Sequence, residues 1–366
     1  MRASMRGGLG GRTALGVASL WFFLAAGGTH ALAAELAVRQ DAHGVTVEVD
    51  GGPFAAYVVD ESNKPYLWPV VGPTGKAMTR AYPMQDVPSE PKPQRDHPHH
   101  RGITFGHESV GTAAWEAAGP TSREGGGDTW HDRLTFELPK AAGKAGPQAD
   151  AKLAALARIV HREFTRVAAE GDRAVVEEVC DHVDAVGKPF LVERRRLMFG
   201  LGAGTRWIDV DQEFRLADPE RPVTFDDRKD AGLFIRVPTT MAVDSRQGGR
   251  IENSEGLVDA AAWSQPARWC DYSGPVGEER LGIAILNHPE SFRHPTRWHV
   301  RTYGLFAANP FASRGYDAAL PEAATTLSGG ETVRLHHRFL FHACPAKDVI
   351  ESVYADYANT SRITWP

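Results

Sequence analysis

The residues best suited to chemistry lie in one short segment, 95–108, which reads Arg-Asp-His-Pro-His-His-Arg-Gly-Ile-Thr-Phe-Gly-His-Glu. It holds four imidazoles, two guanidiniums and two carboxylates. Histidine is the side chain whose protonation changes near neutral pH, and it is also the commonest metal ligand. The segment therefore predicts a site for acid–base catalysis or for ligand binding, and the alternative is a polar surface loop.

Two uses of these histidines are open. If the backbone is extended here, His97 and His99 share one face and His100 points to the other. A divalent metal would be held by His97 and His99, with His107 or His131 as a third ligand and water as the fourth. The spacing matches no established metal motif, so the cofactor stays open. Without a metal, the same groups act as general acid or base and as hydrogen-bond donors to hydroxyls.

A second group of polar and aromatic residues lies between 287 and 309. An extended strand is predicted over 297–305, and one side of it carries Arg297, His299, Arg301 and Tyr303. His288 precedes this strand and Asn309 follows it, each next to a proline. Any one of these residues is more often structural than functional, but their joint density favours a site.

Two shorter stretches add candidates. Trp130 and His131 follow the glycine-rich stretch 124–128, and an aromatic face suits a sugar ring. The charged turn 225–232 precedes the apolar strand 233–237. It is either a solvated turn or a means of bringing a carboxylate and Lys229 to the rim of a cleft.

The elements that must position these residues are mostly strands. Extended runs over 159–169, 173–186, 189–199 and 205–216 are separated by short turns, so they must be antiparallel neighbours. In the last run, apolar residues share one face, while the polar face is either wet or lines a groove. A last strand is predicted over 331–342 and a helix from Pro345 to about Asn359.

The regions between these runs are irregular. Four prolines make 79–95 a long loop that leads into the histidine segment, and 139–150 is predicted to be an exposed insertion. The fold class is therefore mainly β, a large antiparallel β-sandwich with one C-terminal helix, and 35–366 is predicted to be a single domain.

Composition and the N-terminus restrict the function further. Residues 1–34 combine three arginines, an apolar run and small residues before a cleavage site, which predicts a signal peptide and an exported protein, periplasmic or extracellular. The remaining 38 basic and 46 acidic side chains give a net charge of −8, which argues against nucleic acid. No later run is long and apolar enough to span a membrane, and three cysteines allow at most one disulfide.

Several common active-site motifs are absent from the sequence. It contains no Gly-X-Ser-X-Gly, no P-loop, no dinucleotide-binding glycine motif and no His-Glu-X-X-His. A serine hydrolase, an NTPase, a dinucleotide-dependent enzyme and an ordinary metalloprotease therefore lose support.

Several strings together resemble a known family. They are Asp-His-Pro-His-His-Arg-Gly at 96–102, Gly-His at 106–107, the turn 227–232 with its following strand, Asn-His-Pro at 287–289 and Asn-Pro-Phe at 309–311. Through these strings the sequence resembles an exported bacterial family labelled the PmoA family, or methane oxygenase PmoA. The resemblance covers nearly the whole mature chain. Here the turn 226–232 reads Asp-Asp-Arg-Lys-Asp-Ala-Gly where that family more often has Gly-Asp-X-Lys-Glu-Gly.

The resemblance implies a fold similar to the β-supersandwich of galactose mutarotase-like proteins and a carbohydrate ligand. It does not imply methane oxidation, because a membrane monooxygenase subunit needs several long apolar helices and this chain has a mean hydropathy of −0.33.

We therefore expect an exported enzyme that acts on a sugar or glycoside through histidine acid–base chemistry, by hydrolysis, elimination or epimerisation. The expected catalytic residues are His97, His99, His107, His288 and His299. The expected substrate-binding residues are His100, Arg101, Trp130, His131, Lys229, Arg301, Tyr303 and Asn309. The alternative is a non-catalytic glycan-binding or cell-envelope protein. Both require the regions near residues 100 and 300 to meet in one pocket.

Overall fold

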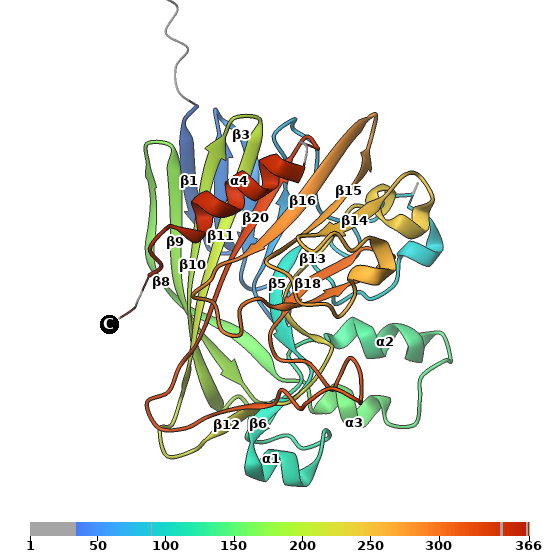
Figure 1. Ribbon diagram of the computed structural model, residues 1–366. Helices are drawn as coiled ribbons and strands as arrows, with labels where there is room; N and C mark the ends of the chain where they lie inside the picture. Colours follow the sequence, from blue (N-terminus) through green and yellow to red (C-terminus); the bar gives the residue numbers. More distant parts are fainter. Residues whose placement is uncertain (1–33, 89, 345–346, 364, 366) are drawn as a thin grey trace, which may run out of the picture. The chain divides into compact units, whose positions relative to one another are not determined.

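Four long strands joined by tight turns form the centre of the fold. A computed structural model describes residues 34–88, 90–344, 347–363 and 365, so the predicted signal peptide lies outside the described residues apart from Ala34. The four strands are β8 (Arg158–Glu170), β9 (Arg173–Val183), β10 (Pro189–Gly202) and β11 (Thr205–Leu216). Each pairs antiparallel with the next, which confirms the predicted meander (Figure 1).

The meander is half of an eight-stranded sheet with the order β14-β15-β16-β20-β11-β10-β9-β8. Its other strands are β14 (Arg250–Asn253), β15 (Trp269–Val276), β16 (Glu279–Asn287) and β20 (Val333–His342). The last of these confirms the predicted final strand.

A second eight-stranded sheet has the order β1-β2-β3-β4-β5-β13-β18-β17. Its strands are β1 (Leu36–Asp41), β2 (Gly44–Val49), β3 (Gly52–Val58), β4 (Tyr66–Val70), β5 (Ile103–His107), β13 (Ala231–Arg236), β18 (Leu305–Asn309) and β17 (Arg297–Val300). A small third sheet contains β19 (Thr325–Leu327), β12 (Val223–Phe225), β6 (Val110–Thr112) and β7 (Gly126–Gly127).

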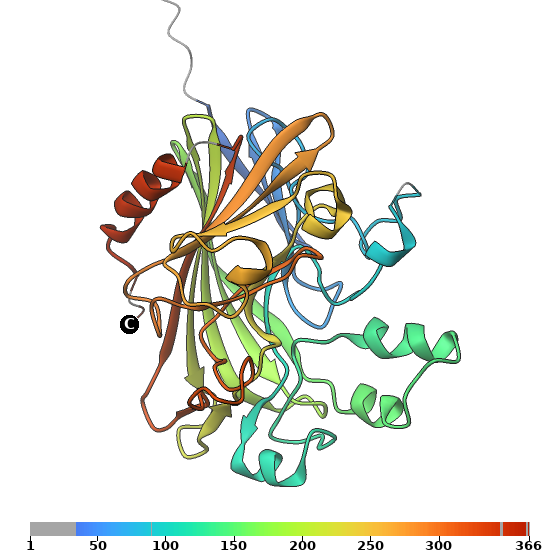
Figure 2. The ribbon, with the colours of Figure 1, turned by 45° about the vertical axis from the view of Figure 1, so that its right-hand side comes forward.

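The two large sheets pack face to face through aromatic side chains. Phe54 on β3 meets Phe199 on β10 with ring centroids 5.6 Å apart, and Phe105 on β5 meets Phe214 on β11 at 4.8 Å. These rings belong to one core cluster that draws residues from both sheets, seen one behind the other in Figure 2. The predicted antiparallel β-sandwich is confirmed, and apolar burial between the sheets is its main source of stability.

Helices are short and lie outside the sandwich core. They are α1 (Ala113–Ala118), α2 (Arg133–Ala141), α3 (Ala149–Ala154) and α4 (Lys347–Ala358), with 3-10 turns at Lys92–Gln94, Thr239–Met241, Val243–Ser245 and Asp259–Ala262. The predicted C-terminal helix is confirmed as α4, while Pro345 lies outside the described residues. In α4, Ile350, Tyr354 and Tyr357 are buried against β15, β16 and β20.

The region 139–150 is exposed over most of its length, as predicted, and the end of α2 and the start of α3 occupy its two ends. A capping box explains where α2 begins: the Asp132 side chain accepts from Thr135 N, and the Thr135 hydroxyl contacts Asp132 N. Pro139 lies inside this helix, so the local capping contacts outweigh the helix-breaking tendency of one proline.

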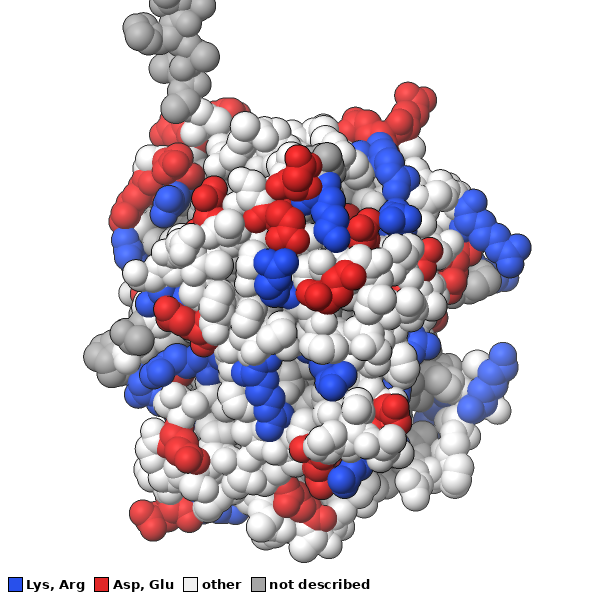
Figure 3. All heavy atoms as spheres, in the orientation of Figure 1, with Lys and Arg blue, Asp and Glu red and all other residues white. Residues whose placement is uncertain are grey.

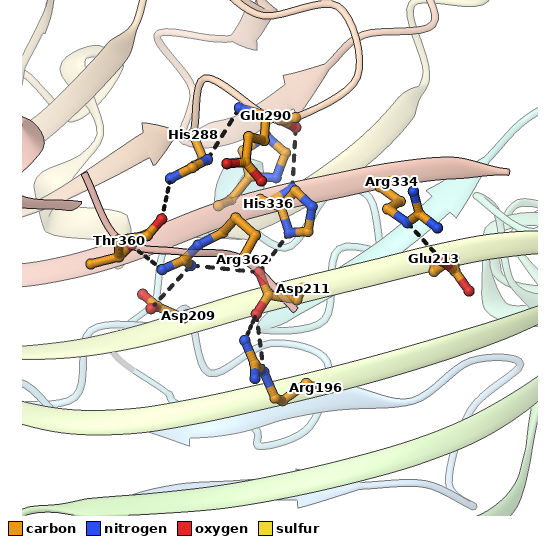
Figure 4. A network of polar contacts seen from close by, with 12 residues as sticks. Arg196, Asp209, Asp211, Glu213, His288, Glu290, Arg334, His336, Thr360 and Arg362 are labelled. Carbon is orange, nitrogen blue, oxygen red and sulfur yellow. Dashed lines mark hydrogen bonds and ion pairs between the residues drawn. The ribbon is translucent and has the colours of Figure 1, made fainter. Parts of the chain in front are cut away.

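Two predicted strand features are wrong. The single strand 297–305 is a hairpin, in which β17 and β18 pair and the segment between them turns with a hydrogen bond from Gly304 N to Arg301 O. The polar face of β11 is neither wet nor a groove, because Asp209, Asp211 and Glu213 are fully buried. Arginines from β10, β20 and the C-terminal segment cover these carboxylates (Figure 4).

The three cysteines, Cys180, Cys270 and Cys344, are unpaired. Among the described residues, no helix has the length and apolar character needed to cross a membrane.

Candidate active site

A pocket of about 250 Å³ joins four separate segments of the chain. Its walls are His97, His99, His100, Trp130, His131, Lys229, Asp230, His299, Arg301 and Tyr303. The regions near residues 100 and 300 thus meet in one concave site, as expected from the sequence. They meet because β5, β13, β18 and β17 are neighbours in one sheet, and the segments that line the pocket adjoin these strands.

A buried ion cluster fixes the histidine segment. Asp96 Oδ1 accepts hydrogen bonds from Arg80 Nη1 at 2.9 Å and from Arg236 Nη2 at 2.7 Å. Arg80 also donates to the His97 carbonyl, so the backbone is held at the turn itself. Burial of Asp96 opposes ionisation, but the hydrogen bond with His97 and the charges of Arg236, His97 and Arg80 outweigh it and hold its pKa at about 2.

The histidine segment is a turn and not an extended strand. His97 has a φ of 45°, and His100 N donates to His97 O at 3.0 Å. The turn brings His100 into the pocket beside His97 and His99, so the prediction that His100 points away is wrong. Gly102 follows with a φ of 47°, and a Cβ there would lie 1.9 Å from Leu67 O, which excludes any larger residue.

Stacked rings form one wall of the pocket. The His97 ring is parallel to the His100 ring at 4.9 Å and to the Tyr303 ring at 5.2 Å. His97 Nδ1 lies 2.6 Å from Asp96 Oδ2, which orients the ring, and the His97 side chain keeps 41% of its surface exposed. His97 therefore presents an oriented ring edge to a ligand.

His99 and His100 are buried and neutral. His99 Nδ1 lies 2.9 Å from the Thr135 hydroxyl, and Arg236 Nη1 donates to His100 Nδ1 at 3.3 Å. Burial, joined by the charge of His131 for His99 and of Arg236 for His100, holds both pKa values well below the usual range. These two rings suit hydrogen bonding more than proton donation at neutral pH.

His131 has the opposite electrostatic environment. Its Nδ1 lies 2.7 Å from Asp128 Oδ2, while Asp128 Oδ1 accepts from the backbone N–H groups of Trp130 and His131, both at 2.9 Å. Burial lowers the pKa of His131, but the Asp128 carboxylate, helped by Glu108 and Asp230, outweighs it and raises the pKa. His131 is thus held toward its protonated form with a fixed orientation.

His299 on β17 is buried, and one of its ring nitrogens lacks a hydrogen-bond partner. That nitrogen, Nδ1, lies 3.8 Å from Asp230 Oδ1, too far for a hydrogen bond but close enough for a charge interaction, and no described residue forms a hydrogen bond with it. Burial lowers its pKa to about 4, although Asp230 acts in the other direction. The Trp130 ring lies parallel to it at 6.5 Å.

Three expected site residues, His107, Arg101 and Asn309, do not line the pocket. His107 is fully buried between Phe225 and Phe311, its Nδ1 accepts from Ser109 N, and burial lowers its pKa to about 3. Arg101 pairs with Asp132 at 3.3 Å and lines a different hollow. Asn309 is buried and donates from Nδ2 to the carbonyls of Arg228 and Lys229, so it shapes the turn that carries Lys229.

His288 does not line the pocket but lies beside Glu290, His336 and Thr360 (Figure 4). Its Nε2 lies 3.0 Å from Thr360 O, and its Nδ1 accepts from Glu290 N. It adjoins the network in which Arg362 approaches the buried Asp209 and Asp211. The expected catalytic role is therefore not supported by its position, and the contacts indicate that it anchors the C-terminal segment.

Sequence reasoning missed two supporting groups: Asp128 orients His131, and Arg236 holds both Asp96 and His100. The one carboxylate in the pocket wall, Asp230, lies in the charged turn 225–232, in line with the alternative that this turn brings a carboxylate and Lys229 to a cleft. A charged residue at the end of the apolar run 231–235 was the available signal for Arg236. The three-residue spacing of Asp128 and His131 in a loop was the signal for their pairing.

In the part of the chain that the structure describes, no group of three or more His, Cys, Asp or Glu side chains is arranged to hold a metal ion. The pocket histidines are instead engaged by protein groups: His97 by Asp96, His99 by Thr135, and His131 by Asp128.

Comparison with solved structures gives distant likenesses. A GH36 α-galactosidase from Geobacillus stearothermophilus is 11% identical with a TM-score of 0.38, and the match covers 84% of this chain but 41% of that one. A GalM/aldose epimerase homologue from C. elegans is 8% identical with a TM-score of 0.33, over 85% and 98% of the two chains. A polysaccharide lyase is 10% identical with a TM-score of 0.32, over 85% and 33%.

The chain thus spans about two fifths of the length of the α-galactosidase that it matches. At these identities and TM-scores, the likenesses carry no argument about activity. No curated protein matches the sequence. A family model matches residues 44–354, and the chain therefore belongs to DUF6807, a family of unknown function.

Proposed function

We propose that this protein is an exported carbohydrate-active enzyme that acts on a sugar or glycoside by histidine acid–base catalysis. One observation carries the proposal: His131 and His299 line the same pocket, each beside its own carboxylate, and their environments favour opposite protonation states. Titratable groups whose surroundings push their pKa values apart are the usual acid and base of an active site. The resemblance to the exported family labelled PmoA agrees with this proposal.

His131 is suited to act as the general acid. Asp128 occupies its Nδ1, and no described residue forms a hydrogen bond with its Nε2. The raised pKa keeps a proton on the ring near neutral pH. That proton can pass from Nε2 to a sugar oxygen as it leaves or as a ring opens, and Asp128 prevents the ring from rotating away.

His299 is suited to act as the general base. With a pKa of about 4 it is neutral at pH 7, so it can accept a proton from a hydroxyl, from water or from a carbon next to a carbonyl. The imidazolium that forms would be stabilised by Asp230, whose Oδ1 lies 3.8 Å away. This carboxylate thus stabilises the charged state more than the resting state, which is what catalysis requires.

The remaining walls suit one sugar ring. The stacked rings of His97 and Tyr303 supply apolar surface, and Lys229 supplies a polar group, while the buried Trp130 supports the wall from behind against Phe234. The volume of about 250 Å³ lies just below the roughly 300–1,000 Å³ of pockets that hold drug-sized ligands. We therefore expect one monosaccharide unit to occupy the site.

The test is turnover of a panel of oligosaccharides, aldoses and aryl glycosides, followed by mass spectrometry and proton NMR. The wild type should convert at least one sugar, and His131→Gln and His299→Gln should each lower the rate at least 100-fold while leaving folding intact. A new mass identifies hydrolysis or elimination, and an altered anomeric signal identifies epimerisation. Binding without any product would contradict the proposal and favour the non-catalytic glycan-binding alternative.

A further inference from the structure

The pocket wall carries more positive than negative charge, although the protein as a whole is acidic. Lys229 and Arg301 face one carboxylate, Asp230, whereas the whole chain has a formal net charge of −5. On the face seen in Figure 3, acidic and basic side chains are interspersed without an extended patch of either sign. The excess of positive charge in the pocket is therefore a local feature.

Of Lys229 and Arg301, the lysine and arginine in the pocket wall, Arg301 is the one with no acidic partner among the described residues. Its guanidinium lies over the Trp263 ring at 5.2 Å and the Tyr303 ring at 5.7 Å, and no described carboxylate lies within ion-pair distance of it. The two buried arginines beside the histidine turn, Arg80 and Arg236, both bind Asp96. Arg301 is thus oriented by aromatic faces, while the edge of its N–H fork remains available.

The backbone around Arg301 is fixed as well. Its N–H donates to Leu305 O at 2.8 Å, its carbonyl accepts from Gly304 N, and the Tyr272 hydroxyl donates to the same carbonyl at 3.2 Å. Little conformational freedom is left for a ligand to remove, which favours binding.

Lys229 provides a second positive charge, which Asp230 partly neutralises. Its Nζ lies 3.2 Å from Asp230 Oδ2, and half of its side chain is exposed. Asp230 also lies near His299 and His131, so this single carboxylate is shared among several cations and leaves Arg301 uncompensated. Asn309 fixes the turn by donating to the Lys229 carbonyl.

From this geometry, and resting on the function proposed above, we infer that the substrate is a sugar that carries a carboxylate, a uronic acid residue, bound through Arg301 with Lys229 nearby. A planar carboxylate fits the two parallel N–H groups of a guanidinium. The charge of a protonated His131 is offset by its partner Asp128, so Lys229 and Arg301 against Asp230 leave an excess of one positive charge, which the single negative charge of a carboxylate matches. A phosphate ester, with about −1.5 to −2 charges, would exceed that balance.

The inference is tested by isothermal titration calorimetry of the full mature chain with methyl glucuronide and methyl galacturonide, their neutral parents, and glucose 6-phosphate. The wild type should bind a uronide at least 10-fold more tightly than its neutral parent. Arg301→Gln should remove that preference, so that a uronide and its neutral parent bind with affinities within about 2-fold of each other. The matched control is Arg314→Gln, which changes a surface arginine paired with Glu322 and should change neither affinity.

Other outcomes separate this inference from the proposed function. Equal binding of uronide and neutral parent would overturn the carboxylate inference alone, and tightest binding of the phosphate would overturn the choice of carboxylate. Failure to bind or convert any sugar would overturn the proposed function itself. If Arg301→Gln does not fold, the salt dependence of binding to the wild type tests the inference instead. The affinity for the uronide should fall as NaCl rises from 50 to 500 mM, while the affinity for the neutral parent stays constant. An equal change in both affinities would refute the inference.

Discussion

Replacing Asp96 with Asn tests the contact that holds the histidine turn in place. This carboxylate is shared by two arginines that are almost completely buried, Arg80 and Arg236, and by the partly exposed His97. Asn preserves the size of the side chain but removes its charge. Two buried guanidiniums then lose their only carboxylate partner within ion-pair distance among the described residues.

The magnitude follows from the pKa of Asp96. A shift from 3.8 in the unfolded chain to about 2 in the folded protein corresponds to roughly 2.5 kcal/mol, since each pKa unit is about 1.36 kcal/mol. Solvent screening of the partly exposed carboxylate lowers this to about 2 kcal/mol. The attraction of the two buried arginines is already contained in this shift, so we expect Asp96→Asn to destabilise the fold by about 2 kcal/mol at pH 7.

The dependence on pH has a definite sign. Because the folded pKa lies below the unfolded one, the stabilisation is complete above about pH 5 and is lost as the pH falls from about 4 toward 2. The difference in stability between the wild type and Asp96→Asn should therefore shrink in acid. Urea unfolding followed by tryptophan fluorescence at pH 7, 5 and 3 measures this difference.

Asp86→Asn is the control, because Asp86 pairs with Arg95 at 2.8 Å but keeps 78% of its side chain exposed. Such surface pairs contribute about 0–1 kcal/mol. If Asp96→Asn were no less stable than Asp86→Asn at pH 7, or if its deficit grew in acid, the ion cluster would not be what holds the histidine turn.

Three further outcomes are expected. His299→Gln should lower kcat by about 10²–10⁴ with little change in KM, measured by initial rates on the substrate identified above. The pH–rate profile of the wild type should have an acidic limb near pH 4, where His299 becomes protonated. It should also have an alkaline limb above the ordinary histidine range, where His131 loses its proton, and His131→Gln should remove this limb. Arg362→Gln should destabilise the fold by about 1–3 kcal/mol in urea unfolding, because it withdraws a buried cation from Asp209 and Asp211.

Local patterns predicted a large part of this fold. The alternation of apolar and polar residues and the short glycine turns fixed the meander from β8 to β11, since such turns allow only antiparallel neighbours. The stripe of Ile350, Tyr354 and Tyr357 likewise predicted α4. The density of histidine, arginine and aromatic residues near 100 and 300 also selected most of the pocket wall.

The rest depends on contacts that no local pattern encodes. The turn between β17 and β18 was missed because the alternation of residues from Arg297 to Tyr303 continues across it. The polar face of β11 gave no sign that arginines from distant segments would bury it. His107 and His288 were chosen by residue type, but tertiary packing makes the first a core residue and the second an anchor for the C-terminal segment.

The central claim is that one pocket holds His131 protonated and His299 neutral at the same pH. A nitrogen-15 NMR titration of histidine-labelled protein, with His131→Gln and His299→Gln used for assignment, measures both groups without any knowledge of the substrate. His131 should lose its proton above pH 6.5, and His299 should stay neutral until the pH falls to about 4. Titration of both rings together near pH 6.5, or in the reverse order, would contradict the acid and base roles assigned to them.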